Sequence, residues 1–181
     1  MRVLLVFLLL AGLSVIAVFS LQQRSIARQT QYDSLIQPVA AQLEIDPLLV
    51  RALIWRESRF QPNVRGLNKE RGLMQVTPGV AAEWAQVTKS PPIDLDSLFI
   101  PATNIEIGCW YLARTIHHWQ DTDNPAAFEQ NISFPTTRRY VDAILQKYAD
   151  YQRGYFRPPW LSWWDRVTKR SDAPTLIRVN P

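Results

Sequence analysis

Residues 54–62 read Ile-Trp-Arg-Glu-Ser-Arg-Phe-Gln-Pro, and here a helical pattern of apolar residues ends at a carboxylate. Upstream, Asp46-Pro47 predicts the start of this helix, because Asp caps helix N-termini and Pro fits the first helical position. Leu53 and Ile54 precede Glu57 by four and three residues, so Glu57 falls on the apolar face. Desolvation disfavours a charged carboxylate, so this position favours a Glu57 that can hold and donate a proton.

A second interpretation of Glu57 is purely structural. Three arginines lie near it in the sequence, Arg56, Arg59 and Arg71, and an ion pair with one of them would explain a charge at a helix end. The position of Glu57 in its helix does not decide between these interpretations.

The rest of the central region also has the spacing of helices. Apolar residues recur at helical intervals in residues 32–43, 78–87, 103–119 and 136–151, with Thr77-Pro78 as a second cap signal. In residues 103–119 the predicted buried stripe is Ile105, Gly108, Cys109, Leu112 and Ile116. No long alternating pattern predicts a strand. The sequence therefore predicts a mainly α domain over residues 32–151, in which residues 89–96 form a Pro-containing loop.

The N-terminal segment has a different character. An uncharged apolar run extends from Val3 to Leu21, which is longer than the roughly 7–15 residues of a signal-peptide core. A run of about 18 or more apolar residues is typical of a membrane-spanning helix. We therefore expect residues 1–21 to be an uncleaved membrane anchor, with a cleaved signal peptide as the alternative. Residues 21–31 are expected to form a short linker or the start of the first helix.

Composition excludes several other classes of protein. The chain has 181 residues, 47% of them hydrophobic and 20% charged, with a net charge of +4, which indicates a folded domain without a nucleic-acid-binding stripe. Cys109 is the only cysteine, so an internal disulfide is impossible. The adjacent His117 and His118 point to different sides of a helix, which makes a shared metal improbable. We expect neither metal nor cofactor.

The C-terminal tail, residues 155–181, is rich in tryptophan. Trp160, Trp163, Trp164 and Val167 fall on one face of a predicted helix. This face is expected to pack back onto the domain. The alternative is a helix that lies on a membrane surface, with its basic residues toward anionic lipid.

Several short motifs follow Glu57 at characteristic distances. Glu57-Ser58 is followed by Gly-Leu-Met-Gln at residues 72–75, by an Asn-Ile-x-x-Gly-x-x-Tyr-Leu block at residues 104–112, and by Phe-Pro-Thr-Thr-Arg-Arg-Tyr-Val at residues 134–141. This series resembles the catalytic domain of the soluble lytic transglycosylases, and the resemblance covers roughly residues 36–148. It implies a lysozyme-like helical fold that cleaves the glycan strands of peptidoglycan.

The resemblance also implies roles for individual residues. Glu57 is expected to be the sole acid and base, which cleaves the bond between N-acetylmuramic acid and N-acetylglucosamine and leaves a 1,6-anhydro ring. Gln75 is expected to hold an N-acetyl sugar, and Gly66, Thr77 and Gln130 stand at other positions that contact the substrate in the family. Gly72 would allow close approach of the backbone to the sugar or would form a tight turn.

Other motif residues are expected to serve the scaffold. Asn104, Gly108 and Tyr111 are interpreted as a cap, a close helix contact and a core residue, and Glu70 as a loop charge. The family's Ala-Tyr-Asn-Ala-Gly block, whose tyrosine lines the cleft, has no counterpart in residues 120–133. Tyr111 and Tyr140 have core-like spacing, so neither is expected to replace that tyrosine.

Three hypotheses follow from these patterns. The first is a lytic transglycosylase anchored in a bacterial membrane and facing the periplasm or cell wall. The second is a weakened or inactive relative that binds peptidoglycan or cell-wall machinery without cutting, because the tyrosine block is missing. The third is a membrane-surface adaptor that depends on the tryptophan-rich tail.

Overall fold

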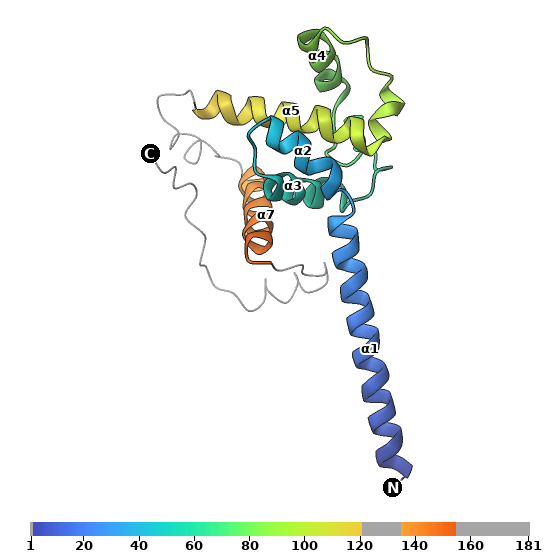
Figure 1. Ribbon diagram of the computed structural model, residues 1–181. Coiled ribbons are helices and arrows are strands. Elements are labelled where there is room, and N and C mark those ends of the chain that lie inside the picture. The colour runs from blue at the N-terminus through green and yellow to red at the C-terminus, as the bar shows by residue number, and fades with distance from the viewer. Residues whose placement is uncertain (1, 121–134, 155–181) are drawn as a thin grey trace.

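The computed structural model describes residues 2–120 and 135–154. The regular elements in these residues are all helices. In order, the elements are α1 (Arg2–Thr30), α2 (Asp33–Gln42), α3 (Pro47–Ser58), α4 (Pro78–Thr88), the 3₁₀ helix η1 (Leu95–Phe99), α5 (Pro101–Gln120) and α7 (Pro135–Gln152). Two isolated β-bridges, Arg65 with Arg71 and Arg71 with Val76, fold back the loop between α3 and α4. The predicted mainly α fold is confirmed (Figure 1).

Two helix starts are fixed by side-chain caps. The Asp46 carboxylate accepts a hydrogen bond of 2.7 Å from the Leu48 backbone N–H, and Pro47 follows as the first residue of α3. The Thr77 hydroxyl accepts from the Val80 N–H at 3.2 Å at the start of α4. Each cap satisfies a backbone donor that the first helical turn leaves without a partner. Both predicted helix starts are confirmed.

The region predicted as a loop at residues 89–96 contains the beginning of η1. Asp94 caps this short helix, because its carboxylate accepts from the Asp96 backbone N–H at 3.1 Å. Leu98 of η1 is fully buried, whereas the flanking Asp96 is exposed. A five-residue 3₁₀ helix has too few turns to show an apolar period, so the sequence pattern did not predict it.

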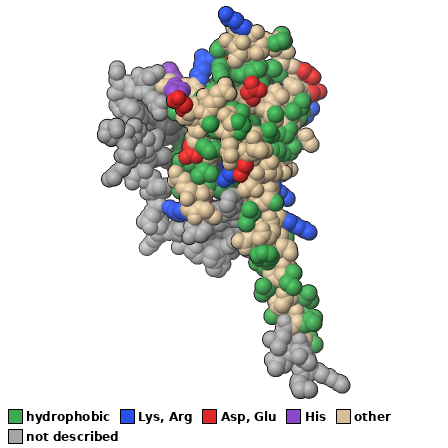
Figure 2. All heavy atoms as spheres, viewed as in Figure 1, with side chains coloured by type: hydrophobic (Ala, Val, Ile, Leu, Met, Phe, Trp, Pro, Cys, Tyr) green, Lys and Arg blue, Asp and Glu red, His purple; other side chains and the backbone are tan. Residues whose placement is uncertain are grey.

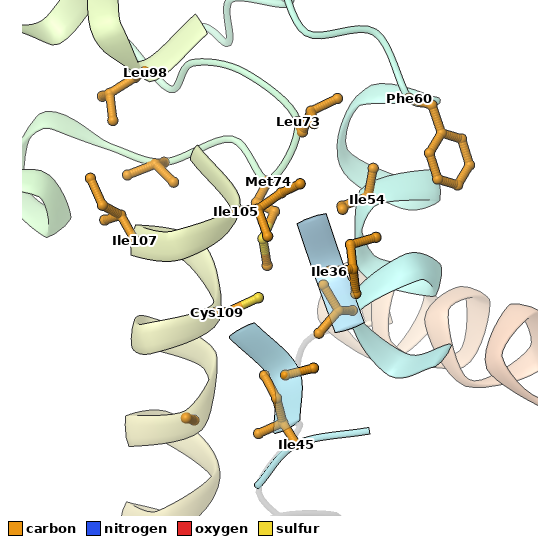
Figure 3. Close-up of a cluster of buried hydrophobic side chains, with 14 of the residues drawn as sticks. Ile36, Ile45, Ile54, Phe60, Leu73, Met74, Leu98, Ile105, Ile107 and Cys109 are labelled. Carbon is orange, nitrogen blue, oxygen red and sulfur yellow. The ribbon is translucent and has the colours of Figure 1, made fainter. Parts of the chain in front are cut away.

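The main core lies between α2, α3, α5 and the loop that precedes α4. Figure 3 shows Ile54 of α3 and Ile36 of α2 on one side, with Ile105 and Cys109 of α5 on the other and Met74 between them. The predicted stripe of α5 is largely correct: Ile105, Gly108 and Cys109 are buried, and Leu112 and Ile116 are half-buried. Ile107, which was not in that stripe, is also fully buried.

One expected core residue lies on the surface. Tyr111 is 46% exposed, because it shares a face of α5 with the exposed Arg114 and His118 three and seven residues later. The prediction of a core role for Tyr111 was therefore wrong. Gly108 meets its expectation, since a Cβ placed there would lie 2.5 Å from the Met74 sulfur, so α5 needs a glycine at this close contact.

Helix α7 packs against α3 and completes the domain. A second cluster of buried residues, Ala52, Ile144 and Tyr151, joins the two helices. The tryptophan-rich tail, the segment predicted to lack the tyrosine block and Gln130 all lie outside the described residues. The predictions for those segments therefore stay predictions.

Helix α1 projects from the domain as one continuous rod (Figure 1). Hydrophobic side chains cover much of its projecting surface in Figure 2, and Phe7, Val15 and Phe19 are each more than 60% exposed. Within the described residues, one helical segment near the N-terminus is long and apolar enough to cross a membrane, a property that signal sequences share. Residues 21–31 were expected to form a short linker or the start of the first helix, but α1 continues through this segment as far as Thr30.

Candidate active site

Glu57 lies in the last turn of α3, next to its final residue Ser58. Val50 and Ile54, seven and three residues before it, are fully buried, and Leu53 is half-buried. Glu57 itself is half-buried. The expected position on the apolar side of the helix is therefore confirmed, and the carboxylate lies where the domain core meets the surface.

The chain leaves α3 abruptly after this carboxylate. Arg59 and Phe60 adopt left-handed backbone conformations, with φ of 53° and 63°. A left-handed residue is a common helix terminator, but it is usually a glycine. Phe60 is buried at 3% exposure, and its packing in the core holds this costly turn in place. The turn stops α3 one residue after Glu57.

Tyr140 of α7 contacts Glu57 directly. Its hydroxyl donates a hydrogen bond to Glu57 Oε1, and the Arg56 guanidinium lies 5.0 Å from the centre of its ring. Burial, and then the hydrogen bond to Glu57, raise the pKa of Tyr140, so the phenol stays a donor at neutral pH. Because α3 and α7 pack together, this contact joins the helix carrying the carboxylate to its main neighbour.

The core-like spacing of Tyr140 did not predict the contact of its hydroxyl with Glu57. Its ring does pack against the second cluster, as its helical spacing predicted. A half-buried tyrosine nevertheless needs a partner for its hydroxyl, and that requirement was the available signal. The partner is 83 residues away in the sequence, so spacing along α7 could not identify it.

The structural interpretation of Glu57 as half of an ion pair finds no support in residues 2–120 and 135–154. Arg71 pairs with Asp96 at 2.7 Å. The Arg59 guanidinium lies 3.5 Å from the centre of the Trp55 ring, over its face. No ion pair described in these residues includes Glu57.

Asn104 holds the loop that follows α3. It is fully buried, and its carboxamide oxygen accepts from the Met74 N–H at 2.7 Å. Its amide group donates to the carbonyls of Arg71 and Leu98, each at 2.8 Å. We call these three hydrogen bonds the bracket around Gly72. Gly72 has a φ of 79°, and a Cβ on this residue would lie 2.2 Å from the Leu98 carbonyl oxygen. Asn104 therefore serves the scaffold as expected, but it holds the loop and is not a helix cap, since it lies within α5. The tight turn expected at Gly72 fits its backbone conformation.

Gln75, predicted to hold a sugar, also holds the loop. Its backbone is left-handed, with φ of 50°, and its side-chain amide donates to the carbonyls of Gly72 at 2.8 Å and Val64 at 3.2 Å. The carboxamide oxygen lies over Gly66, 2.9 Å from where a Cβ of that residue would be. The loop therefore occupies the donors of Gln75 and leaves its oxygen as the group available to a ligand.

Two further loop residues have local partners. The Glu70 carboxylate accepts from Asn68 through its backbone N–H at 2.8 Å and its side-chain amide at 3.0 Å. Hydrogen bonds from its own backbone N–H and from the Asn68 side chain hold the pKa of Glu70 below its usual value. Thr77 serves as the cap of α4. Glu70 thus has the local role expected of a loop charge, and the substrate contacts expected of Thr77 and Gly66 stay predictions.

A separate groove of about 560 Å³ lies among the ends of α2, α4 and α5, lined by Trp110, Arg114 and His117 among others. Glu57 is not part of it. Among the described residues that line the groove, no carboxylate accepts a hydrogen bond from a tyrosine, whereas Glu57 accepts one from Tyr140. The end of α3 is therefore the stronger candidate for an active site.

Comparisons with known proteins identify the family to which this domain is similar. Residues 34–142 match the sequence profile of the transglycosylase SLT domain. The X polypeptide of Escherichia coli K12 is 33% identical over 117 residues, which cover 62% of this chain and 66% of that protein. The membrane-bound lytic murein transglycosylase C of Shigella sonnei is 29% identical over 123 residues, which cover 67% of this chain and 31% of that protein.

A solved structure shows the same fold. The 70 kDa soluble lytic transglycosylase of Escherichia coli superposes with a TM-score of 0.59 at 26% identity, over 68% of this chain and 25% of the larger enzyme. This chain thus spans about two thirds of the X polypeptide and a third or less of the two transglycosylases.

Proposed function

Because the chain belongs to the transglycosylase SLT family, we propose that it is a peptidoglycan lytic transglycosylase with Glu57 as its sole acid and base. The observation that supports this most directly is the Glu57 carboxylate itself. It is half-buried at the end of α3, receives a hydrogen bond from Tyr140 and forms no ion pair within the described residues.

The two carboxyl oxygens of Glu57 have different surroundings. Tyr140 engages Oε1, and the described residues give Oε2 no hydrogen-bond partner. In the proposed reaction, Oε2 carries the proton and Oε1 is held by Tyr140. Tyr140 is then a positioning residue, because it fixes the plane of the carboxyl group without needing to touch the substrate.

The proposed reaction has two proton transfers and consumes no water. Glu57 donates its proton to the oxygen that links N-acetylmuramic acid C1 to N-acetylglucosamine, and the C1–O bond breaks. The carboxylate then takes the proton of the muramoyl C6 hydroxyl as O6 bonds to C1. This closes the 1,6-anhydro ring and restores the protonated Glu57. Hydrolytic glycosidases usually need a second carboxylate to activate water or attack the sugar, and this internal transfer does not.

We further propose that α1 anchors the domain in a bacterial membrane, with Glu57 on the side of the cell wall. The support is the apolar, exposed surface of α1 and the membrane-bound transglycosylase among the relatives. Peptidoglycan strands are the proposed partner.

The test uses the full chain in detergent with purified peptidoglycan, and the released fragments are identified by mass spectrometry. We expect 1,6-anhydromuramoyl ends, and we expect their loss in Glu57→Gln. Glu106→Gln, which changes an exposed glutamate on α5, is the matched control and should keep full activity. Fragments with reducing ends would indicate a muramidase instead.

A second candidate is a relative that binds glycan strands without cutting them. It is favoured by the absence of the tyrosine block from the sequence and by the use of the Gln75 amide within its own loop. Strand binding without released fragments would support it, whereas turnover that depends on Glu57 would exclude it.

A further inference from the structure

The polar end of α1 is part of the folded domain. Gln29 is only 4% exposed, although it lies eight residues beyond the end of the apolar run. Its side-chain amide donates to the Ser25 hydroxyl at 3.0 Å, and its carboxamide oxygen accepts from the Tyr151 hydroxyl of α7 at 2.9 Å. The neighbouring Gln31 donates to the Phe60 carbonyl at 3.4 Å. Helix α1 is therefore attached to the domain by side-chain hydrogen bonds as well as by its covalent connection to α2.

Four helices meet where α1 ends, at a group of residues that we call the stalk junction: Gln29, Asp33, Arg51 and Tyr151. Arg51 of α3 pairs with Asp33 of α2 at 2.6 Å, and its guanidinium lies 5.2 Å from the centre of the Tyr151 ring. Tyr151 and Arg51 are buried, at 4% and 7% exposure. Buried, paired polar groups tolerate little movement, because each would lose its partner without gaining water. The junction is thus a stiff connection between α1 and the domain.

Helix α7 carries both the junction and the contact to the catalytic carboxylate. Tyr151 binds Gln29 near its C-terminal end, and Tyr140 binds Glu57 eleven residues earlier. At about 1.5 Å per residue, these two tyrosines are about 16 Å apart along the axis of α7. By the same rise, Gln29 lies about 12 Å along α1 from Leu21, the last residue of the apolar run.

From this geometry we propose that α1 and α7 form a fixed stalk that holds Glu57 within about 30 Å of the membrane surface. The substrate is then the glycan nearest the membrane, and strands farther out are beyond reach of the anchored protein. This rests on the proposed function of Glu57 and on a membrane-spanning α1. A tilt of either helix away from the membrane normal lowers the site further.

Charges on α1 agree with this placement. Arg24 and Arg28 are exposed and lie between the apolar run and the stalk junction. Arginine side chains just beyond a membrane span reach the level of the lipid headgroups, which keeps their charge out of the hydrocarbon. The start of the stalk is therefore at the membrane surface.

The first experiment measures the stiffness of the stalk without using activity. Spin labels are placed on the full chain in lipid nanodiscs through Ala27→Cys on α1 and Gln146→Cys on α7, both exposed positions. Burial raises the pKa of the native Cys109 thiol to about 12, so this residue should not react with the label. We expect one narrow distance distribution that broadens at least twofold in Gln29→Leu with Tyr151→Phe. Gln22→Leu, an exposed change on the same helix, should leave it narrow, and a broad distribution in the parent protein would overturn the stalk.

The second experiment changes the height of the site. A helical insert of 18 residues between Gln23 and Arg24 adds five full turns, which raises the domain by about 27 Å and keeps its facing. In proteoliposomes, we expect at least a tenfold loss of cleavage of short lipid-linked glycan oligomers and no loss on free soluble strands. The same insert between Arg2 and Val3 leaves the height unchanged and is the matched control.

The two substrates separate the two proposals. If the parent protein fails to cleave free strands, the proposed function is wrong. If free strands are cleaved but the insert after Gln23 leaves cleavage of lipid-linked oligomers unchanged, the fixed height is wrong and the proposed function stands.

Discussion

Asn104 and Glu57 are both polar motif residues beside the same core, yet their surroundings are opposite. Asn104 is fully buried, and three hydrogen bonds use its oxygen and both of its amide hydrogens. Glu57 is half-buried and has one hydrogen bond within the described residues, from Tyr140. Asn104 has all its side-chain bonding groups occupied, as a residue that serves the fold should, whereas Glu57 keeps one oxygen available, as the proposed acid and base requires.

The largest expected effect tests the chemical side of this comparison. Glu57→Gln should lower cleavage of peptidoglycan by about 10²–10⁴-fold, because the carboxamide cannot transfer the proton. The free energy of unfolding should change by less than about 1 kcal/mol, since Gln keeps an oxygen for Tyr140. Urea denaturation and turnover are measured on the same preparation. A variant that loses stability rather than turnover would place Glu57 with the scaffold.

Asn104→Ala should have the opposite profile. We expect a loss of about 3 kcal/mol in unfolding free energy, because the Met74 N–H and two carbonyls lose their partner inside the core. The loss is measured by urea denaturation. Asn68→Ala, which alters an exposed asparagine in the same loop, is the control. A loss below about 1 kcal/mol would show that the bracket around Gly72 is held by other contacts.

Tyr140→Phe tests whether proton transfer by Oε2 of Glu57 requires the hydrogen bond that Tyr140 donates to Oε1. We expect kcat to fall about tenfold while KM stays within about twofold, because a hydrogen bond to a charged group is lost and no substrate contact is removed. Steady-state kinetics on soluble strands provides both constants. Tyr148→Phe is the control, since Tyr148 is on the same helix but donates to Asp46. Equal effects of the two changes would remove Tyr140 from the site.

Gly66→Ser tests whether the loop between α3 and α4 depends on the space next to the Glu70 carboxylate. A Cβ at Gly66 would lie 2.2 Å from Oε2 of Glu70, so Gly66→Ser should displace that carboxylate from Asn68. We expect a loss of about 1 kcal/mol, measured by denaturation. Adding Glu70→Ala should cancel most of that loss, and simple additivity of the two changes would contradict the contact.

The smallest expected effect is a loss of stability in alkali. Burial, and then the hydrogen bond to Asp46, raise the pKa of Tyr148 to about 12, above its ordinary value of 10.0. The unfolded chain therefore releases this proton first, and stability present below pH 10 declines between about pH 10 and 12. Denaturation across this range should show a shallower decline for Tyr148→Phe. An identical decline would mean that Tyr148 does not contribute.

The sequence was sufficient for features that depend on neighbouring residues. Asp46-Pro47 and Thr77-Pro78 fixed two helix starts because a cap is made within three residues. The spacing of Glu57 from Leu53 and Ile54 likewise predicted that Glu57 lies on the apolar face of α3, because these residues are within four positions of each other. Features made by distant residues were missed: the hydroxyl of Tyr140 finds Glu57 across 83 residues. The continuation of α1 to Thr30 was underestimated, although Gln and Arg are good helix formers, because the loss of apolar character was interpreted as a boundary.

The contact between Gly66 and Glu70 also has a consequence for how these two positions are substituted in evolution. The glutamate fills most of the space that a side chain at residue 66 would need, and the Gln75 carboxamide oxygen borders the remainder. A side chain at residue 66 is thus compatible with a small residue at 70, and a glutamate at 70 with a glycine at 66. The two positions are expected to change as a pair in descent, through an intermediate with small residues at both. In an alignment of relatives, they would show covariation rather than separate conservation.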